Sequence, residues 1–220
     1  VDETGCYATT TQELIVNPLP EIITPTPLEE CDDDYDGIVS FFDLSQKTEE
    51  ILNGQTGISV SYYETLENAE SGENPIEGLY TNIEVDTQTL YVRLEVDETG
   101  CYATTTQELI VNPIPIYTNI IDQILCTDTP GFFDIFLSDY DVQVLNGQNA
   151  DQYTITYHTS ADDAENGVNA LENAYTVVDY IDLFVRIEDN ITACYISNID
   201  FTLTVELSLI HISEPTRRIL

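Results

Sequence analysis

Apolar and polar residues alternate along several short stretches of the chain, a pattern that predicts β-strands. Residues 58–63 (ISVSYY) and 153–158 (YTITYH) alternate at every second position, and residues 90–96 (LYVRLEV) place Leu and Val on one face. Successive side chains of a strand point to opposite faces, so each stretch is expected to bury one face and expose the other. We therefore expect Tyr63 and His158 on outward faces.

Two further segments complete the strand pattern. Tyr102–Val111 and Ile196–Val205 are rich in Thr, Leu, Ile and Val, residues that suit a half-buried pleated surface. Asp97–Gly100 and Asp189–Thr192 precede them and are expected to form hairpin turns.

The chain repeats itself with an offset of 93 to 95 residues. Val1–Pro18 recurs without a change at Val96–Pro113. Other segments recur with substitutions: Ile51–Gln55 as Val144–Gln148, Ala69–Gly72 as Ala164–Gly167, and Tyr91–Glu95 as Phe184–Glu188. We therefore expect residues 1–20 to be the C-terminal end of a truncated repeat, followed by complete repeats at 21–115 and 116–206.

The number and spacing of strands in each repeat predict an all-β fold, namely tandem immunoglobulin-like β-sandwich modules. Helical turns near Thr48–Leu52 and Leu66–Glu70 are too short to change this class. Asn17–Pro20, Thr24–Pro27 and Asn112–Pro115 are expected to be short Pro-rich linkers, because proline favours extended, semi-rigid backbone. Alternating sandwiches and spacers of this kind would form a rod.

The last residues, 207–220 (LSLIHISEPTRRIL), resemble a translated sequencing adapter, and we set this tail apart as non-native. A genuine basic extension is the alternative. The chain contains no Met, so we expect it to be an internal fragment. The lack of a signal peptide then carries no information on localisation.

The composition excludes several classes of function. Five Lys and Arg stand against 41 Asp and Glu, giving a formal net charge of −36. Nucleic-acid binding needs a basic surface, so we expect no nucleic-acid partner. No apolar run is long enough to span a bilayer, so we expect no membrane insertion. With 42% hydrophobic residues the chain is expected to fold rather than to be an acidic disordered tail.

The five cysteines, Cys6, Cys31, Cys101, Cys126 and Cys194, form no C-x-x-C pair, which argues against a zinc site. We expect one disulfide in each complete repeat, Cys31–Cys101 and Cys126–Cys194, because the strand after Cys101 should carry the chain away from it. Pairing between repeats, Cys6–Cys31 and Cys101–Cys126, is the rival hypothesis, and free buried thiols are the third. Disulfides would indicate an extracytoplasmic compartment.

The segment Cys31–Gly37 (CDDDYDG) is the one candidate metal site. Its carboxylates alternate, a glycine follows, and an aspartate stands at the twelfth position, which resembles the calcium loop D-x-D-x-D-G-x5-E. The expected ligands of Ca²⁺ are Asp32, Asp34, Asp36, the backbone carbonyl of Ile38, Ser40 and Asp43. A solvated turn whose aspartates bond their own backbone is the alternative. The second repeat keeps only one of these aspartates, so we expect Ca²⁺ in the first repeat alone.

Nothing in the sequence indicates catalysis. His158 is the only histidine before the tail, and Tyr63 occupies its place in the first repeat, so a catalytic base is not expected there. No nucleophile elbow, phosphate loop or zinc-protease motif occurs. Arg93 and Arg186 occupy equivalent positions and are expected to form exposed salt bridges. The sequence therefore predicts that the protein is not an enzyme and binds no catalytic cofactor.

The succession CDDDYDG, FFDL, ILNGQTG, YYETLENAESG, LYVRLE and TGCYATTTQELIVNPLP resembles the tandem immunoglobulin-like repeats of large surface proteins of Bacteroidota. These proteins are associated with gliding motility and with type IX secretion sorting domains. The resemblance covers nearly all of residues 1–206, and it implies export, display on the bacterial cell surface, and an adhesive or stalk-like structural role. Its implied partners are neighbouring repeats of the same chain and, beyond them, surface glycans or other cells.

Two alternatives remain open. One is a carbohydrate-binding module that uses exposed tyrosines such as Tyr63, Tyr91 and Tyr102. The other is an accessory module of a secreted hydrolase.

Overall fold

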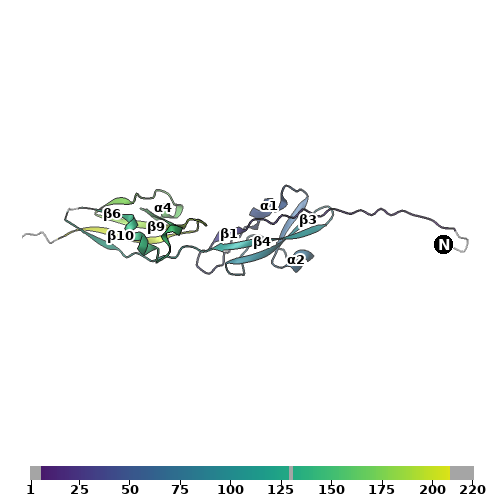
Figure 1. The fold of residues 1–220 in the computed structure, drawn as a ribbon, viewed down its shortest axis with the longest axis horizontal. Helices are drawn as coiled ribbons and strands as arrows, with labels where there is room; N and C mark the ends of the chain where they lie inside the picture. Colours follow the sequence, from purple (N-terminus) through teal and green to yellow (C-terminus); the bar gives the residue numbers. More distant parts are fainter. Residues whose placement is uncertain (1–5, 129–130, 209–220) are drawn as a thin grey trace, which may run out of the picture. The chain divides into compact units, whose positions relative to one another are not determined.

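The structure is a computed structural model that describes residues 6–128 and 131–208 (Figure 1). By its internal contacts the chain divides into two compact units. The first contains the chain up to Glu30 together with Ile38–Val111, and the second contains Cys31–Gly37 together with the chain from Asn112 onward. The acidic segment Cys31–Gly37 thus belongs by contacts to the second unit, although it lies in the first repeat of the sequence.

The first repeat is built on one four-stranded sheet of order β1-β4-β3-β2. Its strands are β1 (Leu28–Cys31), β2 (Ile58–Tyr63), β3 (Thr87–Val96) and β4 (Tyr102–Asn112). Its short helices are η1 (Leu44–Lys47), α1 (Thr48–Leu52) and α2 (Leu66–Ser71). In the described part of this repeat, a single antiparallel bridge between Phe42 and Tyr80 stands in place of a second sheet.

The second repeat has the same sheet with order β5-β10-β9-β7, and β5 runs parallel to β10. Its strands are β5 (Gln123–Thr127), β7 (Tyr153–His158), β9 (Tyr180–Asp189) and β10 (Tyr195–Leu207). The opposite sheet pairs β6 (Phe132–Phe136) with β8 (Ala174–Val178). The helices are η2 (Leu137–Tyr140), α3 (Asp141–Val144), η3 (Ala150–Gln152) and α4 (Ala161–Asn166). The Ile135–Tyr175 pair of this sheet is the sequence equivalent of the Phe42–Tyr80 bridge.

Each repeat has its own hydrophobic core. In the first, the fully buried residues include Phe42, Ile51, Leu90, Val92, Leu94 and Leu109. In the second, they include Leu137, Leu183, Val185, Ile187, Ile199, Phe201 and Leu203. The alternating stretches do bury one face, and the predicted all-β class with tandem immunoglobulin-like modules is confirmed. The stiffness of the Pro-rich linkers stays a prediction.

The duplicated segment adopts two different structures. As Tyr102–Asn112 it is strand β4, and there Leu109 and Val111 are 0% and 5% exposed. In residues 6–20 it forms no strand or helix, and the equivalent Leu14 and Val16 are 85% and 93% exposed. The sequence is identical, so the difference lies in the partner strand β3, which supplies the ladder and the buried face.

Both repeats carry an arginine with the same contacts, and the prediction of exposed salt bridges is wrong for Arg93, which is 8% exposed. Its guanidinium lies 3.5 Å from the Tyr102 ring centroid and pairs with Glu95 at 2.7 Å. It also donates to the carbonyl oxygens of Ala69 and Glu70, at the C-terminal end of α2, where unpaired carbonyls attract a cation. Arg186 repeats these contacts with Tyr195, Glu188, Ala164 and Glu165.

The repeated Leu-Asn-Gly-Gln motif positions the start of each repeat. The Gln55 side chain accepts from the backbone N–H of Glu21 and donates to the carbonyl of the same residue, at 2.8 and 3.0 Å. Gln148 makes the same pair of bonds to Ile116. The side-chain amide of the glutamine thus holds the backbone of the segment with which each repeat begins.

Candidate functional site

The described residues contain one disulfide, between Cys31 and Cys194, with Cα atoms 5.5 Å apart and a sequence separation of 163 residues. Cys31 ends β1 in the first repeat, and Cys194 precedes β10 in the second. The predicted pairs Cys31–Cys101 and Cys126–Cys194 are therefore wrong, and the bond joins the two repeats of the sequence.

Strand geometry explains this correction. Cys101 lies just before β4, whereas Cys31 lies near the other end of that strand, where the backbone N–H of Asp32 donates to the carbonyl of Asn112 at 2.9 Å. The strand has 11 residues. At a rise of about 3.3 Å per residue it separates the two cysteines by roughly 35 Å, while a disulfide needs Cα atoms within about 7 Å. The second repeat has the same arrangement, because Cys126 pairs with Glu206 at the far end of β10 from Cys194.

The rival pairs Cys6–Cys31 and Cys101–Cys126 are also wrong, since Cys6, Cys101 and Cys126 are the free cysteines of the described residues. The sequence carried a signal against pairing within a repeat. A long strand separates the two cysteines of each repeat, so a disulfide of either cysteine has to reach another repeat.

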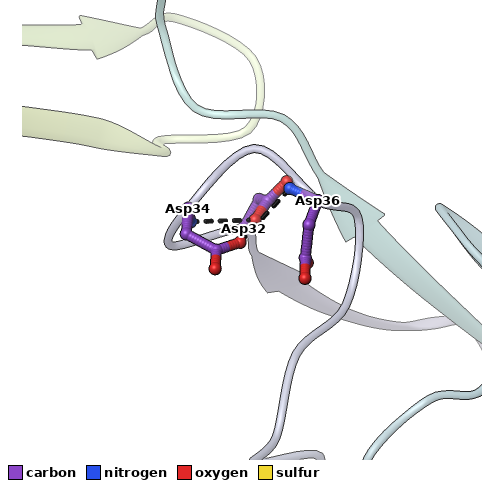
Figure 2. Close-up of side chains that lie close together, drawn as sticks. All are labelled: Asp32, Asp34 and Asp36. Carbon is purple, nitrogen blue, oxygen red and sulfur yellow. Dashed lines mark hydrogen bonds between the residues drawn. The ribbon is translucent and has the colours of Figure 1, made fainter.

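The acidic loop follows β1 directly and folds around Asp32, which is 7% exposed (Figure 2). One carboxylate oxygen of Asp32 accepts from the backbone N–H groups of Asp34 and Tyr35, both at 3.1 Å, and the other accepts from Gly37 at 3.0 Å. Asp34 in turn accepts from the backbone N–H of Asp36 at 3.2 Å. Tyr35 and Gly37 have φ of 70° and 75°, and these left-handed residues give the chain its tight turn.

This turn brings three of the expected metal ligands together. Carboxylate oxygens of Asp32, Asp34 and Asp36 lie within 4.8 Å of one another (Figure 2). Asp43 is not part of that group. Its carboxylate caps η1 and accepts from the backbone N–H and hydroxyl of Ser45 at 3.1 and 2.6 Å. Ile38 and Ser40 follow the loop in irregular backbone, and Ser40 is exposed.

The loop shifts the pKa values of two of its carboxyls in opposite directions. Burial of Asp32 opposes its ionisation, but the backbone hydrogen bonds from Asp34, Gly37, Asp33 and Tyr35 outweigh burial and hold its pKa below the ordinary value. The pKa of Asp34 is raised, by desolvation first and then by the neighbouring charge of Asp36. A bound cation would relieve the repulsion between Asp34 and Asp36.

The loop is also attached to the segment that enters the second repeat. The Tyr35 hydroxyl donates to the backbone carbonyl of Pro115 at 3.0 Å. Tyr35, Ile114 and Tyr117 line a cleft of about 370 Å³ beside the disulfide. Burial, followed by the proximity of Tyr117 and Asp32, raises the pKa of Tyr35. A change in the loop would therefore reach this linker directly.

The outward positions predicted for Tyr63 and His158 are wrong. Tyr63 is 3% exposed and its hydroxyl lies 3.0 Å from that of Ser61. His158 is fully buried, with its ring nitrogens 2.8 Å from the Val168 carbonyl and 2.9 Å from the Thr156 hydroxyl. Helices α2 and α4 pack on strands β2 and β7 and cover this face. Tyr63 is therefore unavailable as a platform for a sugar, and His158 is held between two hydrogen-bonding groups inside the second repeat.

No helix in the described part of the chain is long and apolar enough to cross a membrane.

Two all-β repeats joined by a disulfide define a class of tandem, covalently linked immunoglobulin-like modules. A profile of the Flavobacterium inter-domain disulphide bond domain matches residues 27–115 and again residues 122–209, and the chain belongs to this family. The two matches place Cys31 in one copy and Cys194 in the other.

No curated protein matches the sequence. Among solved structures, the chain is similar to an I-band fragment of titin, with 8% identity over 84% of this chain and 64% of that chain and a TM-score of 0.31. It is also similar to immunoglobulin domains 1–4 of Sidekick-1, with 8% identity over 84% of this chain and 47% of that chain and a TM-score of 0.28. Drosophila N-cadherin EC1-4 matches with 12% identity over 69% of this chain and 42% of that chain and a TM-score of 0.26. The chain thus spans less than two thirds of each of these structures.

Proposed function

We propose that this chain is part of the structural repeat region of a secreted bacterial surface protein and acts there as an acidic, non-enzymatic stalk or adhesive spacer. The observation that carries the proposal is the disulfide between Cys31 and Cys194, which joins two separately folded repeats covalently. Such a bond carries tension past the chain between its two cysteines, which suits a spacer that bears force.

The bond sets how far the chain extends under force. It closes a segment of 163 residues, and at about 3.4 Å per extended residue this segment holds about 550 Å of chain. With the bond intact, pulling at the two ends can unravel only the residues outside Cys31 and Cys194.

Single-molecule pulling of the full chain tests this function. We expect the final length of the oxidised protein to fall short of that of the reduced protein by about 550 Å. The Cys194→Ser variant should reach the full length without reductant, and Cys126→Ser should behave as the wild type does. Equal lengths for oxidised and reduced protein would refute a force-limiting role.

We propose that the protein is exported to the bacterial cell surface. The resemblance found in the sequence implies that gliding motility and type IX secretion are the setting. The disulfide supports an oxidising compartment, and the family supports a bacterial source of this kind. Protease treatment of intact cells should remove the parent protein from the surface. Its protection until the cells are lysed would contradict this location.

We further propose that Ca²⁺ binds at Asp32, Asp34 and Asp36 and stiffens the loop that Tyr35 attaches to the linker. Three converging carboxylates suit a hard cation, and extracellular sites of this kind bind Ca²⁺ with dissociation constants of roughly 10⁻⁴–10⁻³ M. Calorimetric titration after chelation should show one site per chain. Asp34→Asn should abolish it, whereas Asp33→Asn, outside the cluster, should leave it in place. Absence of both heat and a shift in melting temperature would remove Ca²⁺ from the proposal.

The carbohydrate-binding alternative has less support, because Tyr63 is buried and Arg93 lies over one face of the Tyr102 ring. We propose other cells or surface glycans as partners beyond the neighbouring repeats. A glycan array probed with the full chain would test whether it binds surface glycans.

A further inference from the structure

We propose that the open edge of β2 in the first repeat, together with the cleft beside it, is a docking site for an extended basic peptide of another protein. The peptide adds a strand to β2 and places a basic side chain in the cleft, beside Asp43. The inference rests on the proposed adhesive role for its biological setting, and it names the chemistry of the partner.

β2 lies at one edge of the main sheet, and alternate residues of it face outward. The carbonyl of Gly57, just before the strand, accepts from the backbone N–H of Asp97, just after β3, at 2.9 Å. Odd-numbered residues therefore bond β3, and even-numbered ones present their backbone groups to the outer side. The carbonyl of Tyr62 accordingly accepts from the N–H of Ile76 at 2.8 Å. The outward backbone groups of Val60 meet no hydrogen-bond partner among the described residues, and such an edge is a template for an extended peptide.

A cleft of about 440 Å³ opens beside this edge. The side chains of Val60 and Tyr62 form one wall, and Ile76 and Leu79, in the segment after α2, form another. Successive side chains of a strand alternate between the two faces of a sheet. A side chain of an added strand that faces the same way as Val60 would therefore enter the cleft. Apolar walls of this kind suit the aliphatic stem of a lysine or arginine.

Asp43 gives the cleft its charge. Its carboxylate accepts both hydrogen bonds from Ser45 on one oxygen, Oδ1, and Oδ2 has no partner among the described residues. Burial raises the pKa of Tyr62, and the charge of Asp43 adds to this shift, so that charge reaches the wall of the cleft. No Lys, Arg or His is among the described residues that line the cleft, and Lys47 on η1 pairs with Glu50 at 3.7 Å. A basic side chain from outside would supply the missing cation.

A narrower cleft of about 170 Å³, lined by the equivalent residues, lies in the second repeat. Asn173 lines it in the place of Gly78, and its side-chain oxygen accepts from the backbone N–H of Ser138 at 2.9 Å. The one carboxylate in its lining, that of Asp141, already accepts from the Tyr157 hydroxyl at 2.8 Å. The first repeat is therefore the expected site.

The probe is a blocked heptapeptide in which threonine alternates with valine and arginine replaces the central valine. A comparison peptide carries citrulline, which keeps the shape of arginine without its charge. Two further probes carry N-methyl groups on one or the other set of alternate peptide nitrogens. A strand added to β2 pairs through only one of its edges, so one set should abolish binding and the other should leave it in place. Fluorescence anisotropy with the full chain, in about 0.15 M salt, measures the affinity.

Two variants of the full chain test the role of the carboxylate. Asp43→Asn removes the charge and keeps the helix cap, because an asparagine oxygen can accept from Ser45 as that of Asn173 does from Ser138 in the second repeat. Glu108→Gln is the matched control, since Glu108 is exposed on β4, and β3 separates that strand from β2. Hydrogen exchange reports the place of binding, because the amide of Val60 should gain protection when the arginine peptide is bound.

We expect Asp43→Asn to bind the arginine peptide about tenfold more weakly than the wild type does, and no more tightly than it binds the citrulline peptide. Glu108→Gln should bind as the wild type does. Equal affinities of the two variants, equal binding of both N-methylated probes, or lack of binding by the wild type would overturn the proposal. None of these measurements involves force, the disulfide or the cell surface, so their failure is distinct from failure of the pulling experiment.

Discussion

Removal of the disulfide by Cys194→Ser is expected to lower the stability of both repeats together. The bond closes a loop of 163 residues, and the chain-entropy relation assigns such a loop about 5 kcal/mol at 25 °C. A whole protein is stabilised by about 5–15 kcal/mol, so this is a large share. Loss of the bond lowers the free energy of unfolding by the full amount only when both repeats unfold. A repeat that stays folded already restricts the ends of the loop.

Guanidinium denaturation followed by circular dichroism measures the effect. The wild type should unfold at a higher denaturant concentration than Cys194→Ser, and reductant should abolish the difference. Cys126→Ser is the matched control, because it removes an exposed thiol that forms no bond. It should unfold as the wild type does in the absence of reductant.

A double-mutant comparison sharpens the test. Cys31→Ser, Cys194→Ser and the double variant should be equally destabilised, because either substitution alone removes the whole bond. The reasoning is refuted if Cys194→Ser in the absence of reductant unfolds at the same midpoint as Cys126→Ser.

Three further predictions concern other contacts. Arg93→Ala should destabilise the first repeat by about 2–3 kcal/mol in thermal unfolding, because it removes hydrogen bonds to carbonyls, an ion pair and an aromatic contact, and Arg93→Lys should recover only part of this. The pKa of Asp141 is raised, and burial is the main cause. The hydrogen bond from the Tyr157 hydroxyl opposes this shift, and the charge of Asp139 adds to it. The folded state then loses stability as pH rises through that pKa, so Asp141→Asn should be more stable than the wild type at pH 7 and equal to it below the unfolded pKa of about 3.9; a gap that widens toward low pH would contradict the burial argument. In hydrogen exchange, amides of residues 102–112 should be protected and those of the identical residues 7–17 should not; equal protection would show that the segment forms a strand without β3.

The strands were predictable because alternation depends only on which face of a sheet is buried. The same rule failed at Tyr63 and His158, since a short helix after the strand covers the face that a lone strand would expose. Local helix caps show a related limit. Asp43 fits the twelfth position of a calcium loop by spacing, but an aspartate before a helical turn also caps it, and capping is the use that the structure records.

The acidic cluster was predictable because its ligands are alternate residues of one tight turn. The disulfide was not predicted, although the sequence could have excluded pairing within a repeat. The argument that a strand carries the chain away from Cys101 was applied to Cys126 and not to Cys31, which lies near the far end of the same strand. The exact repeat of residues 1–18 likewise carries the sequence of a strand twice, while among the described residues only the copy beside β3 forms one.

The link between Cys31 and Cys194 also changes what a cut in the polypeptide does. A protease that cleaves one peptide bond anywhere between these residues leaves both products attached through sulfur. In a longer array with overlapping disulfides of this kind, every interior peptide bond would lie between the two cysteines of at least one disulfide. A filament built in this way would survive a single nick without shedding its outer portion, and one cut would sever it only after the spanning disulfides are reduced.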